Sequence, residues 1–337
     1  MVGSNQSQRF MISTRLTTFF DIEHPIISAP MAFAAGGKLA AAVSNAGGLG
    51  LIGGAYGEEL WVEEAFGTAG NAEVGCGFIT WNLSNALQTH PSLLEQVLER
   101  QPKAFMLSFG DPEPYLKHVR EACVPLICQV QTLRDAQHCL DLGVDVIVAQ
   151  GSEAGGHGEA RATMTLVPEI ANYISKNSKD TLLCAAGGIA DGRGLAAALM
   201  LGADGVLVGS RLWASKEANV HPAMWDAALK STGDETIRSS VMDIARRLNW
   251  PDRYTARVLK NAFTDQWHDD LVGLIANAEK QALLWKEAWQ TGDMEIANTF
   301  VGEATGLIND IQPASDIIET MVTQAEQIIQ KQAAMIN

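Results

Sequence analysis

Glycine and histidine gather in one short stretch of this chain, residues 151–158, and that combination is suited to chemistry. The stretch follows the apolar, β-branched run at 144–149, which is short enough for a strand buried on both faces. Glycine lets the backbone adopt positive φ and approach a ligand closely, and His157 can exchange a proton near neutral pH. The alternative is a tight strand-to-helix turn whose histidine only hydrogen-bonds its own loop, and the spacing alone leaves both interpretations open.

Two further segments have the residues for a phosphate site. Ala186, Gly187 and Gly188 end the seventh predicted strand and begin its loop, and Gly209 and Ser210 follow the eighth. In parallel barrels a ligand phosphate often lies on the loops after these two strands, where backbone N–H groups and a short helix N-terminus converge. The alternative is that small residues only fit crowded strand ends. The GxxxxGK[ST] sequence of a P-loop is absent, which argues against a nucleoside triphosphatase.

A repeated strand-and-helix pattern must position these segments. Eight such units predict an α/β fold, a parallel (β/α)8 TIM barrel. The competing doubly wound sheet would more often show GxGxxG after its first strand and an acidic residue about 20 positions later, and neither is present. The predicted strands are residues 24–31, 49–55, 74–80, 104–109, 125–130, 144–149, 182–186 and 205–208. The predicted helices are 36–46, 61–66, 83–100, 113–122, 132–142, 168–176 and 194–201.

The pattern changes after residue 215. Helical spacing replaces the alternation, and six of the eight tryptophans lie between residues 213 and 289. We therefore predict an added helical subdomain at 216–299, with the tryptophans as its core rather than as a substrate cage. An amphipathic helix at 316–330 would return as the eighth barrel helix. The barrel domain is thus expected to comprise residues 20–215 and 300–337.

Composition narrows the class of protein. The chain has 337 residues, 47% hydrophobic and 19% charged, which is typical of a well-packed soluble enzyme. A net charge of −15, from 24 basic and 39 acidic residues, disfavours binding to nucleic acid. The five cysteines are an odd number without metal-ligand spacing, and no HExxH motif occurs, so we expect reduced cysteines and no metal site.

The sequence offers no sign of a membrane segment. No apolar run reaches the about 18 residues that a spanning helix needs. Residues 1–20 lack the apolar core and the small-residue cleavage site of a signal peptide, and they are predicted to form a short polar arm. These features favour a cytoplasmic protein without a membrane partner.

The motifs resemble those of the nitronate monooxygenase family, once called 2-nitropropane dioxygenases. The likeness extends from residue 20 to residue 215 and resumes at 301–308. The first two motifs together are specific to the superfamily, and related flavin enzymes share them. The matching text is AQGSEAGGHG at 149–158, AGGIADGRG at 186–194 with LGADGV at 201–206 and GSR at 209–211, PIISAPM at 25–31 with AGGLG at 46–50, and VGEATGLI at 301–308.

The resemblance implies an FMN-dependent enzyme that uses O2 to oxidise alkyl nitronates, and nitroalkanes as further candidates, to a carbonyl compound and nitrite. By position, Gly188, Gly209 and Ser210 would hold the FMN phosphate. His157 would face the substrate, orient its nitro group and take the α-proton of a neutral nitroalkane. The other residues that it places at the cofactor are Ala29, Met31, Ala32, Gln129, Gln150, Gly151, Ala186 and Gly187.

Gln129 departs from the pattern, since some relatives carry lysine at that position. A neutral amide removes a positive charge near the flavin, which affects how the reduced flavin would be stabilised. The resemblance is compatible with a homodimer.

Two other functions compete with this interpretation. One is an NAD(P)H-dependent reductase on the same scaffold, either a quinone reductase or an enoyl-acyl-carrier-protein reductase. An acidic surface disfavours docking of an acidic carrier protein, although a basic patch at Arg246, Arg247 and Arg253 would offset it. The other is a non-catalytic flavin- or phospholigand-binding protein, whose sign would be an apolar residue in place of His157.

Overall fold

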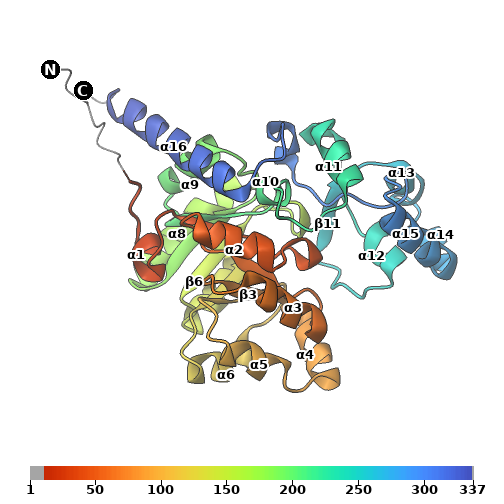
Figure 1. The fold of residues 1–337 in the computed structure, drawn as a ribbon, viewed down its shortest axis with the longest axis horizontal. Helices are drawn as coiled ribbons and strands as arrows, with labels where there is room; N and C mark the ends of the chain where they lie inside the picture. Colours follow the sequence, from red (N-terminus) through yellow and green to blue (C-terminus); the bar gives the residue numbers. More distant parts are fainter. Residues whose placement is uncertain (1–10, 336–337) are drawn as a thin grey trace.

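The computed structural model describes residues 11–335, and at their centre eight parallel strands form a barrel (Figure 1). The sheet order is β1-β9-β8-β6-β5-β4-β3-β2. A parallel bridge between Ile27 and Leu49 brings the two ends of the sheet together, and the Ser28 N–H donates to the Leu49 carbonyl at 2.9 Å. The TIM-barrel prediction is confirmed. The strands are β1 (Ile26–Ser28), β2 (Leu51–Gly53), β3 (Gly75–Ile79), β4 (Phe105–Ser108), β5 (Leu126–Val130), β6 (Val146–Gln150), β8 (Leu182–Ala186) and β9 (Gly205–Val208).

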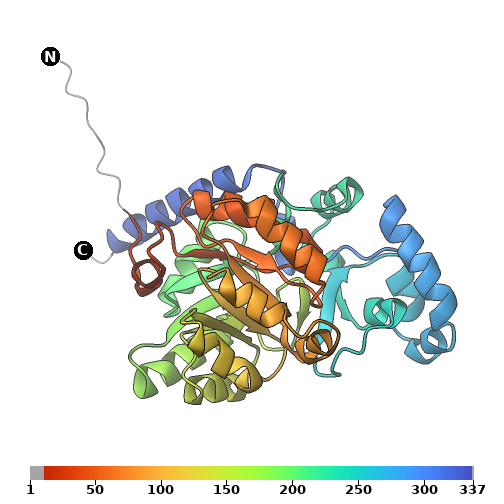
Figure 2. The same ribbon diagram turned by 60° about the horizontal axis from the view of Figure 1, so that its bottom comes forward.

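Helices surround the barrel on its outer side (Figure 2). The last helix, α16 (Ala314–Ala333), packs against α9 (Gly192–Met200) and α2 (Gly37–Asn45). It therefore occupies the place of the eighth barrel helix, as predicted (Figure 1). The surrounding helices are α2 (Gly37–Asn45), α3 (Glu59–Ala69), α4 (Thr80–Thr89), α5 (Leu93–Glu99), α6 (Leu116–Glu121), α7 (Leu133–Asp141), α8 (Thr163–Asn177), α9 (Gly192–Met200) and α16 (Ala314–Ala333).

Two helix predictions need correction, and proline is the reason for both. The single helix predicted at 83–100 is two helices, because Pro91 disfavours helical dihedrals at His90, where φ is −128° and ψ is 77°. The helix predicted to begin at Pro168 begins at Thr163. Pro168 lies within it, near its N-terminal end, where the missing N–H removes the hydrogen bond to the Met164 carbonyl.

The barrel interior is filled by apolar side chains that point inward from alternate strand positions. A short helix, α1 (Arg15–Phe20), adds the buried side chains of Leu16 and Phe20 to this interior cluster. The predicted polar arm at 1–20 is therefore wrong for residues 15–20, and residues 1–10 lie outside the described range. The cluster comprises Leu16, Phe20, Ile27, Leu49, Leu51, Ala104, Met106, Ile127, Val146, Val148, Leu182, Cys184, Ala186 and Leu207.

The chain between α10 (Ser210–Trp213) and α16 is mainly helical, as predicted, and lies to one side of the barrel (Figure 1). It also contains two strands that the sequence did not predict, β10 (Thr236–Ser239) and β11 (Thr255–Leu259). Its treatment as a separate domain stays a prediction. The helices are α11 (Pro222–Leu229), α12 (Val241–Arg246), α13 (Ala262–Trp267), α14 (Leu271–Ala276) and α15 (Ala278–Thr291).

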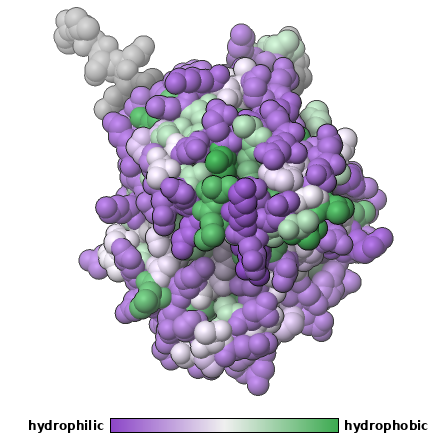
Figure 3. Space-filling view, turned by 90° about the vertical axis from the view of Figure 1, so that its right-hand side faces the viewer, coloured by the Kyte–Doolittle hydropathy of each residue, from purple (hydrophilic) through white to green (hydrophobic). Residues whose placement is uncertain are grey.

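The outer face of this added segment is mainly hydrophilic, with separate apolar patches (Figure 3). Val272 on α14 and Leu283 on α15 are among its exposed apolar residues. None of the helices that residues 11–335 form combines the length and the apolarity that crossing a bilayer requires.

The packing of α16 against the barrel gives a stability prediction. Ile318 is fully buried among the barrel helices. Replacing it by alanine removes buried methylene groups and leaves a cavity, so Ile318→Ala should lower the free energy of unfolding by about 2–5 kcal/mol. Urea unfolding measures the change, with Thr323→Ala on the exposed face of α16 as the control. Equal effects of the two substitutions would show that α16 does not contribute to the core.

Candidate active site at the barrel mouth

A cavity of ≈ 700 Å³ lies at the carboxyl ends of the barrel strands. Gly77 of β3, Ser108 of β4 and Gln129 of β5 line one part of it, and Arg246 and Trp250 of the added segment line another. The cavity is therefore enclosed by the barrel mouth together with the added segment. This is the end of a TIM barrel at which ligands bind.

Nearly all residues predicted for the site lie together in this cavity. Gly151 is the exception, because it does not line the cavity. Its N–H donates to the Ala186 carbonyl at 2.8 Å, and an added Cβ would lie 2.0 Å from the Thr163 hydroxyl, so glycine is required there for packing. The predicted residues that line the cavity are Ala29, Met31, Ala32, Gln129, Gln150, His157, Ala186, Gly187, Gly188, Gly209 and Ser210.

The loops after β8 and β9 present backbone N–H groups to the cavity. Gly187 and Gly188 have φ of +103° and +74°, a region that favours glycine. Within residues 11–335, the N–H groups of Gly188, Gly209 and Ser210 donate no hydrogen bond. The Ser210 hydroxyl accepts from the Gly302 N–H at 2.9 Å, which leaves its own hydrogen available. Unpaired donors beside an open cavity fit an anionic ligand.

The backbone around His157 is a short strand rather than the predicted loop. This strand, β7 (Gly156–Gly158), pairs with β11 in an antiparallel sheet that β10 completes, and His157 lies opposite Ala256. The Gln150 side-chain amide donates to the His157 carbonyl at 3.1 Å and accepts from Gln131 at 2.8 Å. Both the sheet and the end of β6 therefore fix the position of the histidine.

Glu153 braces the start of this segment. Its carboxylate accepts from the Thr163 N–H at 3.0 Å and from the Thr163 hydroxyl at 2.8 Å. Its carbonyl accepts from the Glu303 N–H at 2.9 Å, which attaches the segment to the 301–308 region. These bonds agree with a structural role for Glu153 rather than a catalytic one.

The imidazole of His157 contacts Asp243 and Trp250 of the added segment, and Phe109 of the barrel lies edge-on to it with ring centroids 6.2 Å apart. Its Nε2 lies 2.9 Å from Oδ2 of Asp243 on α12, and the two side chains are only 8% and 4% exposed. Nη2 of Arg246 lies 2.8 Å from the other carboxylate oxygen. The ring of Trp250 stacks on the imidazole, with centroids 3.4 Å apart and planes within 4°.

The surroundings keep His157 uncharged. Burial lowers the pKa of His157 from its ordinary value of about 6.5, and the nearby Asp243 carboxylate opposes part of that shift. Arg246 and Arg238 lower the pKa further. The side chain is therefore a neutral imidazole at neutral pH, a state in which it can accept a proton.

Tyr56 and Arg246 bring polar groups to the same part of the cavity. The Tyr56 hydroxyl accepts from Trp250 Nε1 at 3.2 Å, and both Tyr56 and Arg246 line the cavity. Burial raises the pKa of Tyr56, with Arg246 opposing the shift, so the phenol stays protonated. Two of the five N–H groups of the guanidinium donate to Met242 and Asp243, and Tyr56 is a further partner. The rings of Trp285 and Phe300 lie against the guanidinium, with centroids 5.7 and 5.2 Å from Cζ.

Sequence reasoning missed Asp243 and placed Trp250 in the wrong part of the added segment. Of the predicted basic patch, Arg246 pairs with Asp243, and Arg253 pairs with Asp135 and Glu159, whereas Arg247 is exposed. Trp250 belongs to the cavity rather than to the core of the added segment, whereas Trp267 and Trp285 are buried in that core as predicted. No local motif marks Asp243, which lies 86 residues from His157.

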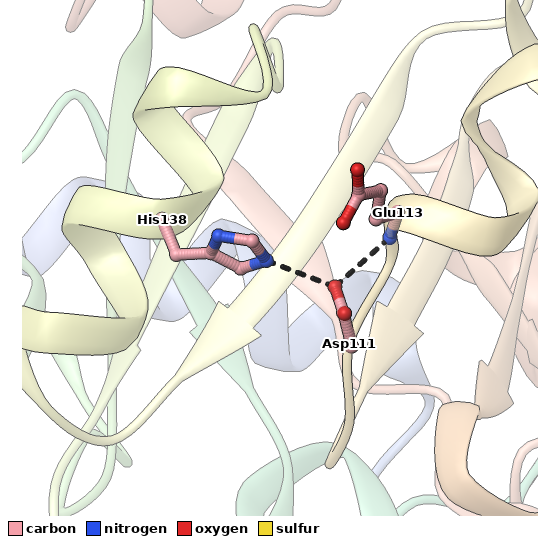
Figure 4. Close-up of side chains that lie close together, drawn as sticks. All are labelled: Asp111, Glu113 and His138. Atoms are coloured by element: carbon pink, nitrogen blue, oxygen red, sulfur yellow. Dashed lines mark hydrogen bonds and ion pairs between the residues drawn. The ribbon is translucent and has the colours of Figure 1, made fainter.

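A second cluster, Asp111, Glu113 and His138, lies on the surface away from the cavity (Figure 4). The sequence gave no metal motif, yet these three side chains have ligand atoms within 4.8 Å of one another. His138 Nε2 lies 2.9 Å from Asp111 Oδ1, which also accepts from the Glu113 N–H at 3.0 Å. These bonds account for the cluster as exposed side chains that are hydrogen-bonded at a turn.

Comparisons with known proteins identify the family and support the fold. The model of the nitronate monooxygenase family matches residues 13–65 and 78–324. Nitronate monooxygenase of Neurospora crassa is 33% identical, over 94% of each chain. The structure of FabK from Thermotoga maritima superposes with a TM-score of 0.84 and 30% identity, over 96% of this chain and 99% of that one. Nitroalkane oxidase from Streptomyces ansochromogenes has a TM-score of 0.76 at 21% identity, over 93% and 99%, and shows the shared fold.

The stacked indole gives a prediction about protonation. Because Trp250 shields the imidazole from water, Trp250→Ala should raise the pKa of His157 toward its ordinary value of about 6.5. The neutral form would then be lost at a higher pH than in the wild type. Titration of the imidazole by NMR measures the shift, with Trp289→Ala, another residue of the cavity wall, as the control. An unchanged or lower pKa in Trp250→Ala would contradict this account.

Proposed function

Because the chain belongs to the nitronate monooxygenase family, we propose that it is an FMN-dependent oxidoreductase that converts alkyl nitronates and O2 to a carbonyl compound and nitrite. The observation that carries the proposal is a neutral histidine, hydrogen-bonded to a buried carboxylate, in a cavity that also presents unpaired backbone N–H groups. One end of such a cavity suits a phosphate, and the other suits a substrate with an acidic C–H bond.

The donor set fits FMN. The N–H groups of Gly188, Gly209 and Ser210, together with the Ser210 hydroxyl, would bind the phosphate. Ala29, Met31 and Ala32 provide the apolar wall that a flavin ring requires, and Gln129 provides an amide without charge. When bound, the flavin would supply the electron-transfer chemistry between substrate and oxygen.

His157 and its neighbours would bind and deprotonate the substrate. A nitronate already carries negative charge, which the remaining N–H groups of Arg246 and the Tyr56 hydroxyl would attract. A neutral nitroalkane must first lose its α-proton, and neutral His157 is the base that the cavity offers. A positioned base of this kind contributes about 10²- to 10⁴-fold to the rate. Phe109 and Trp250 would keep water away from the exchanging proton.

The likeness to FabK supports a second candidate, an NAD(P)H-dependent reductase on the same scaffold. Such an enzyme must bind a hydride donor, whereas a nitronate oxidase needs only its substrate and oxygen. The pairing of Arg246 and Arg253 with carboxylates reduces the positive charge that could have attracted an acidic carrier protein, although Arg247 stays exposed. This observation favours the nitronate oxidase over the carrier-protein reductase.

An anaerobic flavin assay tests the proposed function. The purified protein, reconstituted with FMN, is expected to bleach on addition of propionate 3-nitronate and to keep its colour with NADH or NADPH alone. Readmission of oxygen should release nitrite, which is measured colorimetrically. Rapid bleaching at low NADH without nitrite release would replace the proposal with the reductase, and failure to take up any flavin would overturn both.

The proposed phosphate site at Gly188, Gly209 and Ser210 gives a prediction about the affinity for FMN. Ser210→Ala removes one hydroxyl donor to a charged group, a loss of about 1.5–3 kcal/mol that corresponds to about a 10- to 100-fold rise in the Kd for FMN. Fluorescence titration of FMN measures the Kd. Ser152→Ala, in the segment before β7 but outside the cavity wall, is the control and should leave the Kd unchanged. Equal affinities for FMN in both variants would place the phosphate elsewhere.

A further inference from the structure

We propose that Asp243 is a positioning residue, which holds the His157 ring with its proton on Nε2 so that Nδ1 offers its lone pair to the substrate. The identity of the substrate rests on the proposed function. The position of the proton is a property of the protein alone, so it can be tested separately.

The argument begins with the contact itself. His157 lies on β7 and Asp243 on α12, and their Nε2 and Oδ2 atoms are 2.9 Å apart inside the protein. An ionised carboxylate can only accept hydrogen bonds, so Nε2 must donate. A neutral imidazole carries a single N–H, and Nδ1 is therefore left unprotonated. Within residues 11–335, Nδ1 has no hydrogen-bonding partner and is not one of the fully buried, unpaired polar atoms.

Trp250 and Asp243 fix different properties of the His157 ring. Trp250 lies parallel to the imidazole, so it fixes the plane of the ring but does not distinguish the two orientations related by a half turn about Cβ–Cγ. Only one of these orientations brings Nε2 to the Asp243 carboxylate. The hydrogen bond therefore selects both the orientation and the tautomer.

The carboxylate is itself fixed by a cation. Arg246 donates from Nη2 to Oδ1 of Asp243 at 2.8 Å and from Nε to the Met242 carbonyl at 3.2 Å. Each carboxylate oxygen thus has its own partner, Arg246 on one side and His157 on the other. The charged groups that act on the imidazole are Asp243 and Arg246 from α12 and Arg238 from β10.

This arrangement suits proton abstraction. The Cα–H bond of the nitroalkane breaks, the proton passes to Nδ1, and the electron pair enters the nitro group to give the nitronate. The imidazolium then lies between two anions, Asp243 on one side and the new nitronate on the other. The carboxylate stabilises the positive charge that develops during the transfer, as in other histidines backed by a carboxylate.

Asp243→Asn is the critical variant because Arg246 dictates how the new amide must lie. A guanidinium only donates, so the asparagine oxygen faces Arg246 and its NH2 group faces Nε2 of His157. Nε2 must then accept, and the proton of the neutral ring moves to Nδ1. Long-range 1H–15N correlation NMR on protein labelled with 15N-histidine, above the pKa of His157, identifies the tautomer. We expect Nε2–H in the wild type and Nδ1–H in Asp243→Asn.

The rate of nitroethane turnover should depend on the tautomer of His157. Asp243→Asn removes the basic lone pair from Nδ1, so turnover of neutral nitroethane should fall about 10²- to 10⁴-fold. Turnover of ethyl nitronate, which needs no base, should change by less than about tenfold, since this variant removes only the contribution of the base. Asp243→Glu keeps a carboxylate and should restore the Nε2–H tautomer with part of the nitroethane activity.

Asp111→Asn is the matched control. Its partner His138 has the same 2.9 Å contact, but that pair is exposed and lies outside the cavity. Asp111→Asn should leave both the His157 spectrum and the two turnover rates unchanged.

Several results would overturn the proposal. They are an Nδ1–H tautomer in the wild type, an unchanged tautomer in Asp243→Asn, or equal losses of nitroethane and nitronate turnover with thermal unfolding unaltered. If Asp243→Asn does not fold, the wild-type and Asp243→Glu spectra decide, because both must show Nε2–H. If the tautomer inverts as expected but neither substrate is turned over by the wild type, the positioning role stands and the proposed function fails.

Discussion

Three residue pairs of antiparallel backbone, between β7 and β11, hold the candidate site together. This pairing brings His157 of the barrel segment to the carboxylate of α12 and fixes the wall of the cavity. It depends on glycine, because an added Cβ at Gly155 would lie 2.5 Å from the carbonyl carbon of Val301. A larger residue there would push the segment away from the 301–308 region and so displace the histidine.

Much of the fold could be predicted because local sequence patterns mark each strand and helix of a TIM barrel. Each buried parallel strand is a short apolar run, and each helix has its own period and its own end signals. The prediction failed where tertiary contacts override local preference. Pro168 lies inside a helix rather than at its start, and residues 15–20 are helical because Leu16 and Phe20 complete the barrel interior.

The candidate site could likewise be predicted only in part. The glycines after β8 and β9 could be found because phosphate binding by backbone N–H groups needs particular residues at particular strand ends. The roles of Asp243, Arg246 and Trp250 could not be predicted from the sequence. These roles arise only when the segment that contains α12 and Trp250 packs on the barrel mouth. Nothing in the residues around Asp243 distinguishes a carboxylate that orients a base from one on an ordinary helix. The tryptophan cluster was a signal, but its members divide between a core and a cavity wall.

The position of the added segment has a consequence for synthesis on the ribosome. The segment lies between β9 and α16 in the sequence, so all eight barrel strands leave the ribosome before α16, the helix that packs against α9 and α2. Domains tend to fold as they emerge, yet about 100 residues separate β9 from α16. An insertion of this length adds little to the entropic cost of loop closure. Nascent chains that have not reached α16 therefore expose the faces of α9 and α2 that this helix covers in the folded protein.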